Sequence, residues 1–136
     1  MTEFVPSDRE LEALKILWEQ GRATVREIWE RLQAQDQRLA YTTVLSLLQV
    51  MEQKGLVGHE PAGKAYAYFA KVERAATFRT LATGFLDKVF DGALDEYLAH
   101  ALGTRRASVE ELDRLEQMIA EAKRRTRRRG EKGARE

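Results

Sequence analysis

The periodicity of the apolar residues changes along this chain, and that change constrains the fold more than any other feature of the sequence. Up to Gly55 the apolar residues recur every three or four positions, as on one face of a helix. Residues 56–60 and 65–69 are instead typical of short strands, and residues 61–64 between them contain Pro and Gly, as turns do. From Val72 the helical period returns. The sequence therefore predicts three helices, a two-stranded hairpin and then further helices.

Helix starts are marked by capping boxes, in which Ser or Thr is followed three positions later by Glu. This pattern predicts helices that begin at Ser7, Thr24 and Ser108, and the apolar period predicts another over about residues 40–54. Three helices followed by a hairpin is the order of elements in a winged helix-turn-helix domain. The predicted core of that domain contains Trp18, Ile28, Trp29, Leu32, Leu47, Leu48 and Phe69.

The expected fold class is mainly α with a small β-wing, in which a winged helix-turn-helix domain is followed by a helical dimerisation segment. Residues 1–71 are expected to form the DNA-binding domain. Residues 72–123 are expected to form the helical dimerisation region, and residues 124–136 a basic, disordered tail.

The 136 residues carry a formal net charge of +1 at pH 7, which hides an uneven distribution. Residues 1–70 carry eight Lys/Arg against ten Asp/Glu, whereas residues 123–136 carry eight against two. A basic C-terminal segment therefore follows a mildly acidic body. The segment is either a solvated end or an arm that binds nucleic acid without sequence preference. The acidic balance of the first 70 residues counts against DNA binding, because phosphate contact usually needs a basic surface.

Several classes of protein are excluded or disfavoured by composition. The chain has no cysteine, which excludes disulfides, thiol nucleophiles and thiolate metal sites. His59 and His100 are its two histidines, and neither has a partner at metal-ligand spacing. With no enzyme motif present, we expect no catalytic activity, no metal and no cofactor. The absence of a long apolar stretch and of a signal-peptide pattern at the start leads us to expect a cytoplasmic protein.

The helix expected over residues 40–54 carries hydroxyl and amide side chains opposite its apolar side. Such groups can pair with base edges in the major groove, and in helix-turn-helix proteins the N-terminal part of this helix reaches the bases. Thr42, Thr43 and Ser46 are therefore predicted to contact bases, with Gln49 on the same side. A solvated helix can present the same polar face, so the pattern alone leaves both interpretations open.

Three further residues are candidates for contacts to the DNA backbone. Lys64 and Tyr66 lie in the expected wing, where contact with phosphate or the minor groove is usual, and Arg26 lies near the start of the second helix. Tyr66 and Tyr68 are also suited to simple packing, so the wing tyrosines leave two roles open.

The helices after Val72 have wide apolar faces and nothing in their own segment that would cover them. A second copy of the chain would cover them, so the sequence predicts a homodimer. The residues expected to form its interface are Phe78, Leu81, Phe85, Val89, Leu94, Leu98, Leu102, Leu112, Leu115 and Ile119.

Residues 39–57, with the sequence LAYTTVLSLLQVMEQKGLV, resemble the recognition-helix segment of the BlaI/MecI family. This family comprises penicillinase and methicillin-resistance repressors and is grouped with the copper-responsive CopY repressors. The resemblance extends to ELEALKILW at residues 10–18, to the wing strand at residues 65–69 and to FLDKVFDG at residues 85–92. It covers about residues 7–103.

The resemblance implies a homodimeric repressor that binds an inverted-repeat operator in double-stranded DNA. It also implies a membrane-bound sensor metallopeptidase as partner, with induction through cleavage in the dimerisation region. Three departures are visible: Val50 replaces an arginine found in many members, His100-Ala101 replaces the Asn-Phe cleaved in the staphylococcal repressors, and the cysteines of the copper-responsive members are absent. The alternative function is a winged-helix module that binds a protein partner and does not read DNA.

Overall fold

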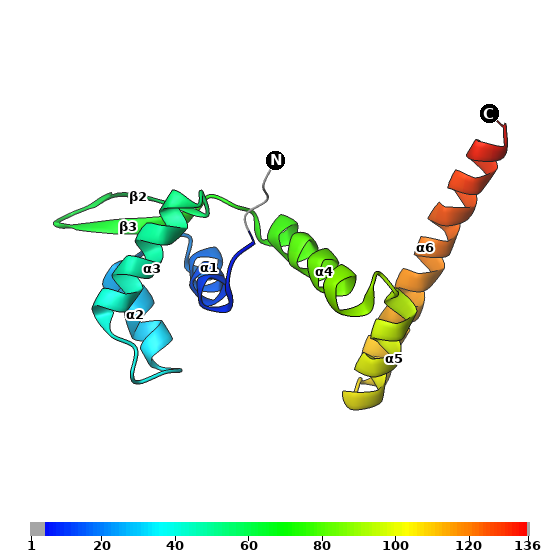
Figure 1. The fold of residues 1–136 in the computed structure, drawn as a ribbon, viewed down its shortest axis with the longest axis horizontal. Helices are drawn as coiled ribbons and strands as arrows, with labels where there is room; N and C mark the ends of the chain where they lie inside the picture. The colour runs from blue at the N-terminus through cyan, green and yellow to red at the C-terminus, as the bar shows by residue number, and fades with distance from the viewer. Residues whose placement is uncertain (1–4, 136) are drawn as a thin grey trace. The chain divides into compact units, whose positions relative to one another are not determined.

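The computed structural model of the protein describes residues 5–135, and its contacts divide the chain into two compact units. The first unit ends at Phe85 and the second begins at Leu86. The elements, in chain order, are α1 (Asp8–Gln20), β1 (Ala23–Thr24), α2 (Val25–Gln33), α3 (Tyr41–Gln53), β2 (Val57–Ala62), β3 (Ala65–Ala70), α4 (Arg74–Phe90), α5 (Leu94–Thr104) and α6 (Val109–Arg135) (Figure 1). The predicted order of three helices, a hairpin and further helices is confirmed.

The first two helices begin as the sequence predicts. The Ser7 hydroxyl accepts from the Glu10 amide while the Glu10 carboxylate accepts from the Ser7 amide, which completes a capping box at α1. Thr24 and Glu27 make the equivalent pair at α2. Gly21 ends α1 with a φ of 85°, a left-handed conformation that glycine adopts without steric cost.

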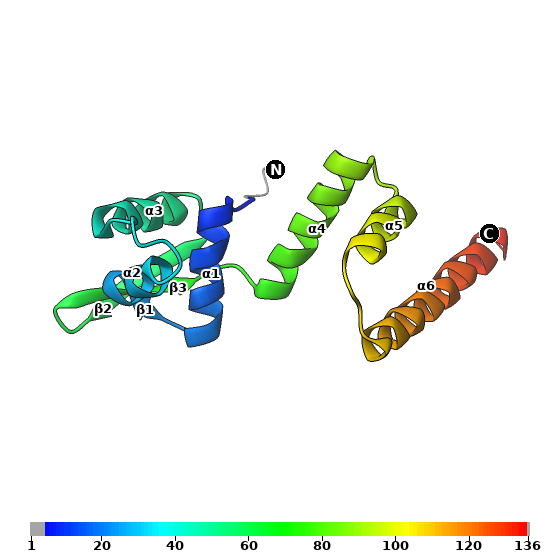
Figure 2. The same ribbon diagram turned by 90° about the horizontal axis from the view of Figure 1, so that it is seen from below.

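A three-stranded antiparallel sheet with the order β1-β3-β2 completes the first unit. Ala62 pairs with Ala65, so the hairpin turns through Gly63 and Lys64 alone, and Gly63 has a φ of 65°. The strand β1 is absent from the sequence prediction, because two residues carry no detectable period. In both views the tip of the hairpin projects beyond the helices of this unit (Figure 2).

The core of the first unit lies where α1, α2 and α3 meet the sheet. Its side chains are buried, and the bulkiest of them come from all three helices: Leu14, Leu17, Ile28, Leu32, Leu48 and Met51. Trp18 and Trp29, predicted to be core residues, are half-buried and pack against this cluster. Within each helix the listed pair lies three or four residues apart, as a one-sided apolar stripe requires.

Trp18 connects the core to the start of α4. Its indole Nε1–H donates to the carbonyl oxygen of Val72 at 2.9 Å, and its ring meets the edge of Phe78 with centroids 5.7 Å apart. The Arg74 guanidinium lies over the Phe78 ring, 4.4 Å from the ring centroid. Phe78, predicted to lie in a dimer interface, is therefore already engaged within its own chain.

The second unit contains the end of α4, α5 and the long helix α6. Ser108 begins α6, and its hydroxyl accepts from the Glu111 amide at 3.1 Å. The segment expected to be a disordered tail instead continues α6 as far as Arg135. Arg and Lys are good helix formers, and the Arg124 guanidinium pairs with Glu121 one turn earlier, which supports helix in the arginine-rich stretch before Gly130.

Candidate nucleic-acid interface

The helix α3 has one buried side and one exposed side. Val44, Leu48 and Met51 are fully buried against the core. The side chains predicted to face DNA all lie on the exposed part of the helix, where Gln53 is exposed as well: Thr42, Thr43, Ser46 and Gln49. With Val50, 43% exposed, they form what we call the outer face of α3. This face consists of hydroxyl, amide and methyl groups and contains no charged residue.

The start of α3 is held against α2. The indole Nε1–H of Trp29 donates to the Leu39 carbonyl oxygen at 2.9 Å, and its ring meets the edge of Tyr41 with centroids 6.0 Å apart. Ala40 precedes the helix and supplies no side-chain cap. The Thr43 amide donates to the Ala40 carbonyl oxygen at 3.1 Å, but Ala40 offers no side-chain oxygen to the first turn of α3, which suits an anionic acceptor such as phosphate.

The end of α3 is held against α1 by an ion pair. Lys54 Nζ lies 3.1 and 3.0 Å from the two carboxylate oxygens of Glu10, whose side chain is 3% exposed. Burial alone would raise the pKa of Glu10. Hydrogen bonds from the Ser7 amide and from Lys54, with the charge of Lys54, outweigh burial and lower that pKa below its usual value. The helix is thus fixed at both ends while its outer face stays exposed.

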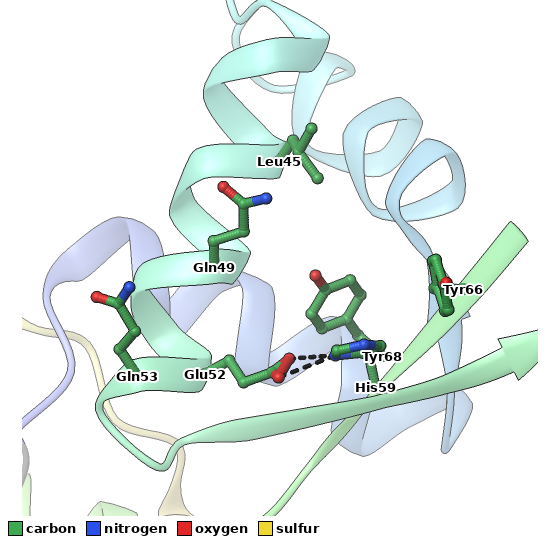
Figure 3. A pocket seen from close by; sticks show the side chains of 7 residues that line it. All are labelled: Leu45, Gln49, Glu52, Gln53, His59, Tyr66 and Tyr68. Atoms are coloured by element: carbon green, nitrogen blue, oxygen red, sulfur yellow. Dashed lines mark hydrogen bonds and ion pairs between the residues drawn. The ribbon is translucent and has the colours of Figure 1, made fainter.

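A groove separates α3 from the wing, and Figure 3 shows the side chains that line it. Glu52 of α3 reaches across to His59 of β2, whose Nδ1 lies 2.5 and 2.9 Å from the two carboxylate oxygens. The His59 ring packs against Tyr66 and Tyr68, with centroids 5.1 and 5.5 Å away. This cluster connects the wing to α3 and sets the space between them.

A second hollow lies between the start of α2, α3 and the tip of the wing. Arg26, Lys64 and Tyr66 all line it, together with Tyr41 and Leu45. The three residues predicted to contact the DNA backbone are therefore gathered at one place. Thr42, Thr43 and Ser46 line neither depression, since they lie on the outer face of α3. Gln49 lines the groove beside the wing.

The acidic residues of the first 70 positions are largely neutralised within the fold. Carboxylates engage basic side chains in pairs away from the outer face of α3: Glu10–Lys54, Glu12–Arg9, Asp36–Arg9, Glu19–Arg31, Glu30–Arg26 and Glu60–Arg22. Glu27 caps α2, and the hydrogen bonds that it accepts from Thr24 lower its pKa. The net negative charge of residues 1–70 argued against DNA binding. The carboxylates that carry it lie away from the outer face of α3, so they do not oppose binding there.

The pair of Glu52 and His59 was not anticipated from the sequence, which shows only that His59 has no partner at metal-ligand spacing. On a helical wheel Glu52 falls beside Leu45 and Gln49, which indicates that it faces the wing. Which residue meets Glu52 depends on the register of the hairpin. That register places His59 opposite Tyr68 on the neighbouring strand. Helical period alone therefore could not find the pair.

In the second unit, one apolar groove collects the predicted interface residues of α5 and α6. It is lined by Leu94, Leu98, Leu102, Leu112, Leu115 and Ile119, with Met118 and Ala122. Exposed fractions are high for such residues, at 47% for Leu102 and 48% for Ile119. An apolar surface of this kind commonly marks a protein interface.

The described residues offer neither a metal site nor a membrane-spanning helix. Between residues 5 and 135, no group of three or more His, Asp or Glu side chains could hold a metal ion. Over the same range, no helix combines the length and the apolar character needed to cross a membrane.

Three known proteins are similar to this chain over part or most of its length. A penicillinase repressor from Bacillus licheniformis is 24% identical over 119 residues, which cover 88% of this chain and 92% of that protein. The crystal structure of YusO from Bacillus subtilis matches with a TM-score of 0.53 and 19% identity, over 88% of this chain and 75% of that one, and supports the fold alone. The solution structure of the DNA-binding domain of the repressor BlaI has a TM-score of 0.47 and 22% identity, over 54% of this chain and 92% of that domain.

The family comparison covers most of the chain. The family described as penicillinase repressor matches residues 6–121, a span that includes the three helices, the wing, α4, α5 and the first half of α6. The same span contains the outer face of α3 and the apolar groove of α5 and α6. The chain belongs to the penicillinase repressor family.

Proposed function

We propose that this protein represses transcription by binding double-stranded DNA with the outer face of α3 in the major groove. The coarser conclusion, a transcriptional repressor that is not an enzyme, follows from the family. The assignment of base contacts to Thr42, Thr43, Ser46 and Gln49 is the finer part of the proposal. Arg26, Lys64 and Tyr66 are proposed to contact the DNA backbone from the hollow beside them.

One observation carries this proposal: α3 is anchored at both ends while a neutral, polar face stays open between the anchors. Hydroxyl groups donate or accept at base edges, glutamine can pair with adenine, and methyl groups meet thymine. Because the outer face of α3 has no carboxylate, it can approach phosphate without repulsion. Lys64 has no ion-pair partner within the described part of the chain, so its charge is available for phosphate.

We further propose that two copies associate through the apolar groove of α5 and α6 and bind an inverted repeat. Two copies related by a two-fold axis present the same helix to two half-sites, so protein symmetry predicts an operator with matching symmetry. The exposed leucines of the groove support this assembly, because their burial between two chains is favourable. Leu81, Phe85 and Val89 of α4 are proposed to extend the interface.

Release from DNA through cleavage by a membrane-bound sensor metallopeptidase is proposed on family grounds. The bond that matches the family's cleavage position, His100-Ala101, lies inside α5. A protease needs an extended backbone, so cleavage there requires part of α5 to unwind. We propose that the protein acts where the DNA is, in the cytoplasm.

The alternative, a winged helix that binds a protein partner, was favoured by the acidic composition of the first 70 residues. The acidic composition supports the protein-binding alternative less than it first suggests, because most of those carboxylates are held in ion pairs. The two functions differ in a direct measurement, which is selection of bound duplexes from a random pool by the purified full chain. We expect enrichment of an inverted repeat with a fixed half-site spacing. An unenriched pool would contradict the proposal and favour the protein-binding alternative.

A further inference from the structure

We propose that the end of α6 binds the phosphate backbone of duplex DNA, as a second and sequence-independent contact of the same protein. We call residues 123–131 the basic end. The inference rests on the proposed function, since it assumes that DNA is the partner of the chain. It concerns a different surface, in the second unit, and a different kind of contact.

Charge is concentrated in the basic end to a degree found nowhere else in the chain. Residues 1–122 carry fifteen Lys/Arg and twenty Asp/Glu. The basic end carries six cations against the single carboxylate of Glu131: Lys123, Arg124, Arg125, Arg127, Arg128 and Arg129. Five of the six are arginine, whose planar guanidinium matches phosphate geometry with two hydrogen bonds at once.

The geometry of the basic end makes these charges available to a partner. All of its side chains are exposed, and they project from a continuous helix. The Arg124 guanidinium pairs with Glu121 in the preceding turn. Within the part of the chain that the structure describes, Lys123 and the other arginines of the basic end form no ion pair. Most of the cationic charge is therefore uncompensated.

The pattern on the helix distinguishes DNA from a membrane surface. At 3.6 residues per turn, the cations spread over about two thirds of the circumference. A helix that lies in a membrane interface needs an apolar face beside its basic one. No apolar side chain occurs from residue 123 to residue 131, so a polymer of phosphates fits this helix better than a lipid bilayer does.

The outer face of α3 has few cations beside it, so a phosphate contact by the basic end would add to the affinity for DNA. The outer face of α3 is neutral, and Lys64 and Arg26 are the cations beside it, with Arg26 already paired to Glu30. Affinity for DNA comes largely from cations that neutralise phosphates and release counterions. The family match ends at residue 121, so the basic end adds cations that the matched span does not supply.

The test compares the salt dependence of binding to a duplex of scrambled sequence for the full chain and two variants. In the first variant, five unpaired cations of the basic end become glutamine, with Arg124 and its partner Glu121 kept: Lys123, Arg125, Arg127, Arg128 and Arg129. In the matched control, five exposed cations elsewhere become glutamine: Lys15, Arg79, Lys88, Arg105 and Arg106. Both variants therefore lose the same net charge.

We expect the slope of log affinity against log salt to flatten in the first variant by up to about 4.5, since each of the five lost phosphate contacts contributes about 0.9. The control should keep most of the slope. A third variant with lysine in place of the four arginines should restore it, which also shows that the helix tolerates substitution. Equal slopes for the first variant and the control would overturn the inference, because net charge alone would then explain the binding. Binding of the basic end to anionic phosphatidylserine vesicles, with an unchanged slope on DNA, would also overturn it.

The outcomes separate this inference from the proposed function. If the full chain enriches an inverted repeat and the first variant keeps the slope, the inference about the basic end fails and the proposed function stands. If the full chain enriches no sequence while the first variant loses its slope, the basic end binds DNA and the proposed role of α3 fails.

Discussion

The ammonium group of Lys54, which follows α3, lies 3.0 and 3.1 Å from the two carboxylate oxygens of Glu10 at the start of α1. The Glu10 side chain is almost completely buried, so the pair fixes the end of α3 to the body of the domain. The position of α3 is thus secured by residues that lie off its outer face, which leaves that face free for binding.

Replacing Glu10 with glutamine tests this anchor. Gln can still complete the capping box with Ser7, so the variant removes the charge pair and little else. We expect the free energy of unfolding at neutral pH to fall by about 1–2 kcal/mol, measured by urea denaturation. Glu12→Gln is the matched control; its pair with Arg9 is only half-buried, with side chains 36% and 41% exposed, so a change within about 0.5 kcal/mol is expected.

The same anchor predicts a dependence on pH. The pKa of Glu10 is lower in the folded protein than its usual value, so the carboxylate form stabilises the fold. This contribution is complete above the usual pKa of glutamate and is lost as the pH falls through the lowered value. The difference in unfolding free energy between the wild type and Glu10→Gln should therefore shrink in acid. A difference that stays constant down to the acid limit of folding would contradict the assignment.

The two tryptophans offer a matched pair of variants. Trp29→Phe and Trp18→Phe each remove one indole hydrogen bond of 2.9 Å, to Leu39 and to Val72 respectively. Each should cost about 0.5–1.5 kcal/mol of unfolding free energy. Trp29 alone holds the start of α3, so Trp29→Phe should weaken operator binding measured by fluorescence anisotropy more than Trp18→Phe does. Equal losses of affinity would show that the start of α3 needs no such support.

Lys64 is predicted to contact phosphate at the tip of the wing. Lys64→Gln should weaken binding about equally for all sequences and lower the salt slope by about 1. Lys71→Gln, an exposed lysine just after β3, is the matched control and should leave the slope unchanged. If Lys64→Gln changes the preferred sequence instead, the wing reads bases.

The dimer is tested at two exposed residues of the apolar groove, one on α5 and one on α6. Changing Leu102 and Ile119 together to aspartate should yield a monomer in light scattering coupled to gel filtration, because two charges per chain would enter an apolar interface. Ala99 and Ala120 are exposed, lie outside the groove and provide the matched double control. A wild-type monomer at high concentration would refute the assembly.

Local patterns predicted much of the fold, where the structure is decided by neighbours in sequence. The capping boxes at Ser7 and Thr24, the end of α1 at Gly21 and the buried stripe of α3 all follow from residues within two helical turns. The burial of Val44, Leu48 and Met51 also determined which face of α3 stays exposed. The exposure of the predicted base-contact residues could therefore be inferred without a structure.

What the sequence did not predict depends on contacts between distant residues. The strand β1 exists because Ala23 pairs with Tyr68, and Glu52 meets His59 because the hairpin returns beside α3. Phe78 carries the apolar signature of an interface residue, yet Trp18 from the first helix covers it. Periodicity identifies an apolar face and does not identify what covers it. Composition likewise suggested disorder after residue 123, where the structure has helix.

The most direct test of the central claim repeats the random-pool selection with variants on the outer face of α3. Thr43→Ala and Ser46→Ala should each relax the enriched half-site at one position and weaken binding to it by about 1–3 kcal/mol. Thr83→Ala removes an exposed hydroxyl from α4 and should return the wild-type sequence at wild-type affinity. If all three variants enrich the same sequence with unchanged affinity, these two side chains do not read the operator and the account is contradicted.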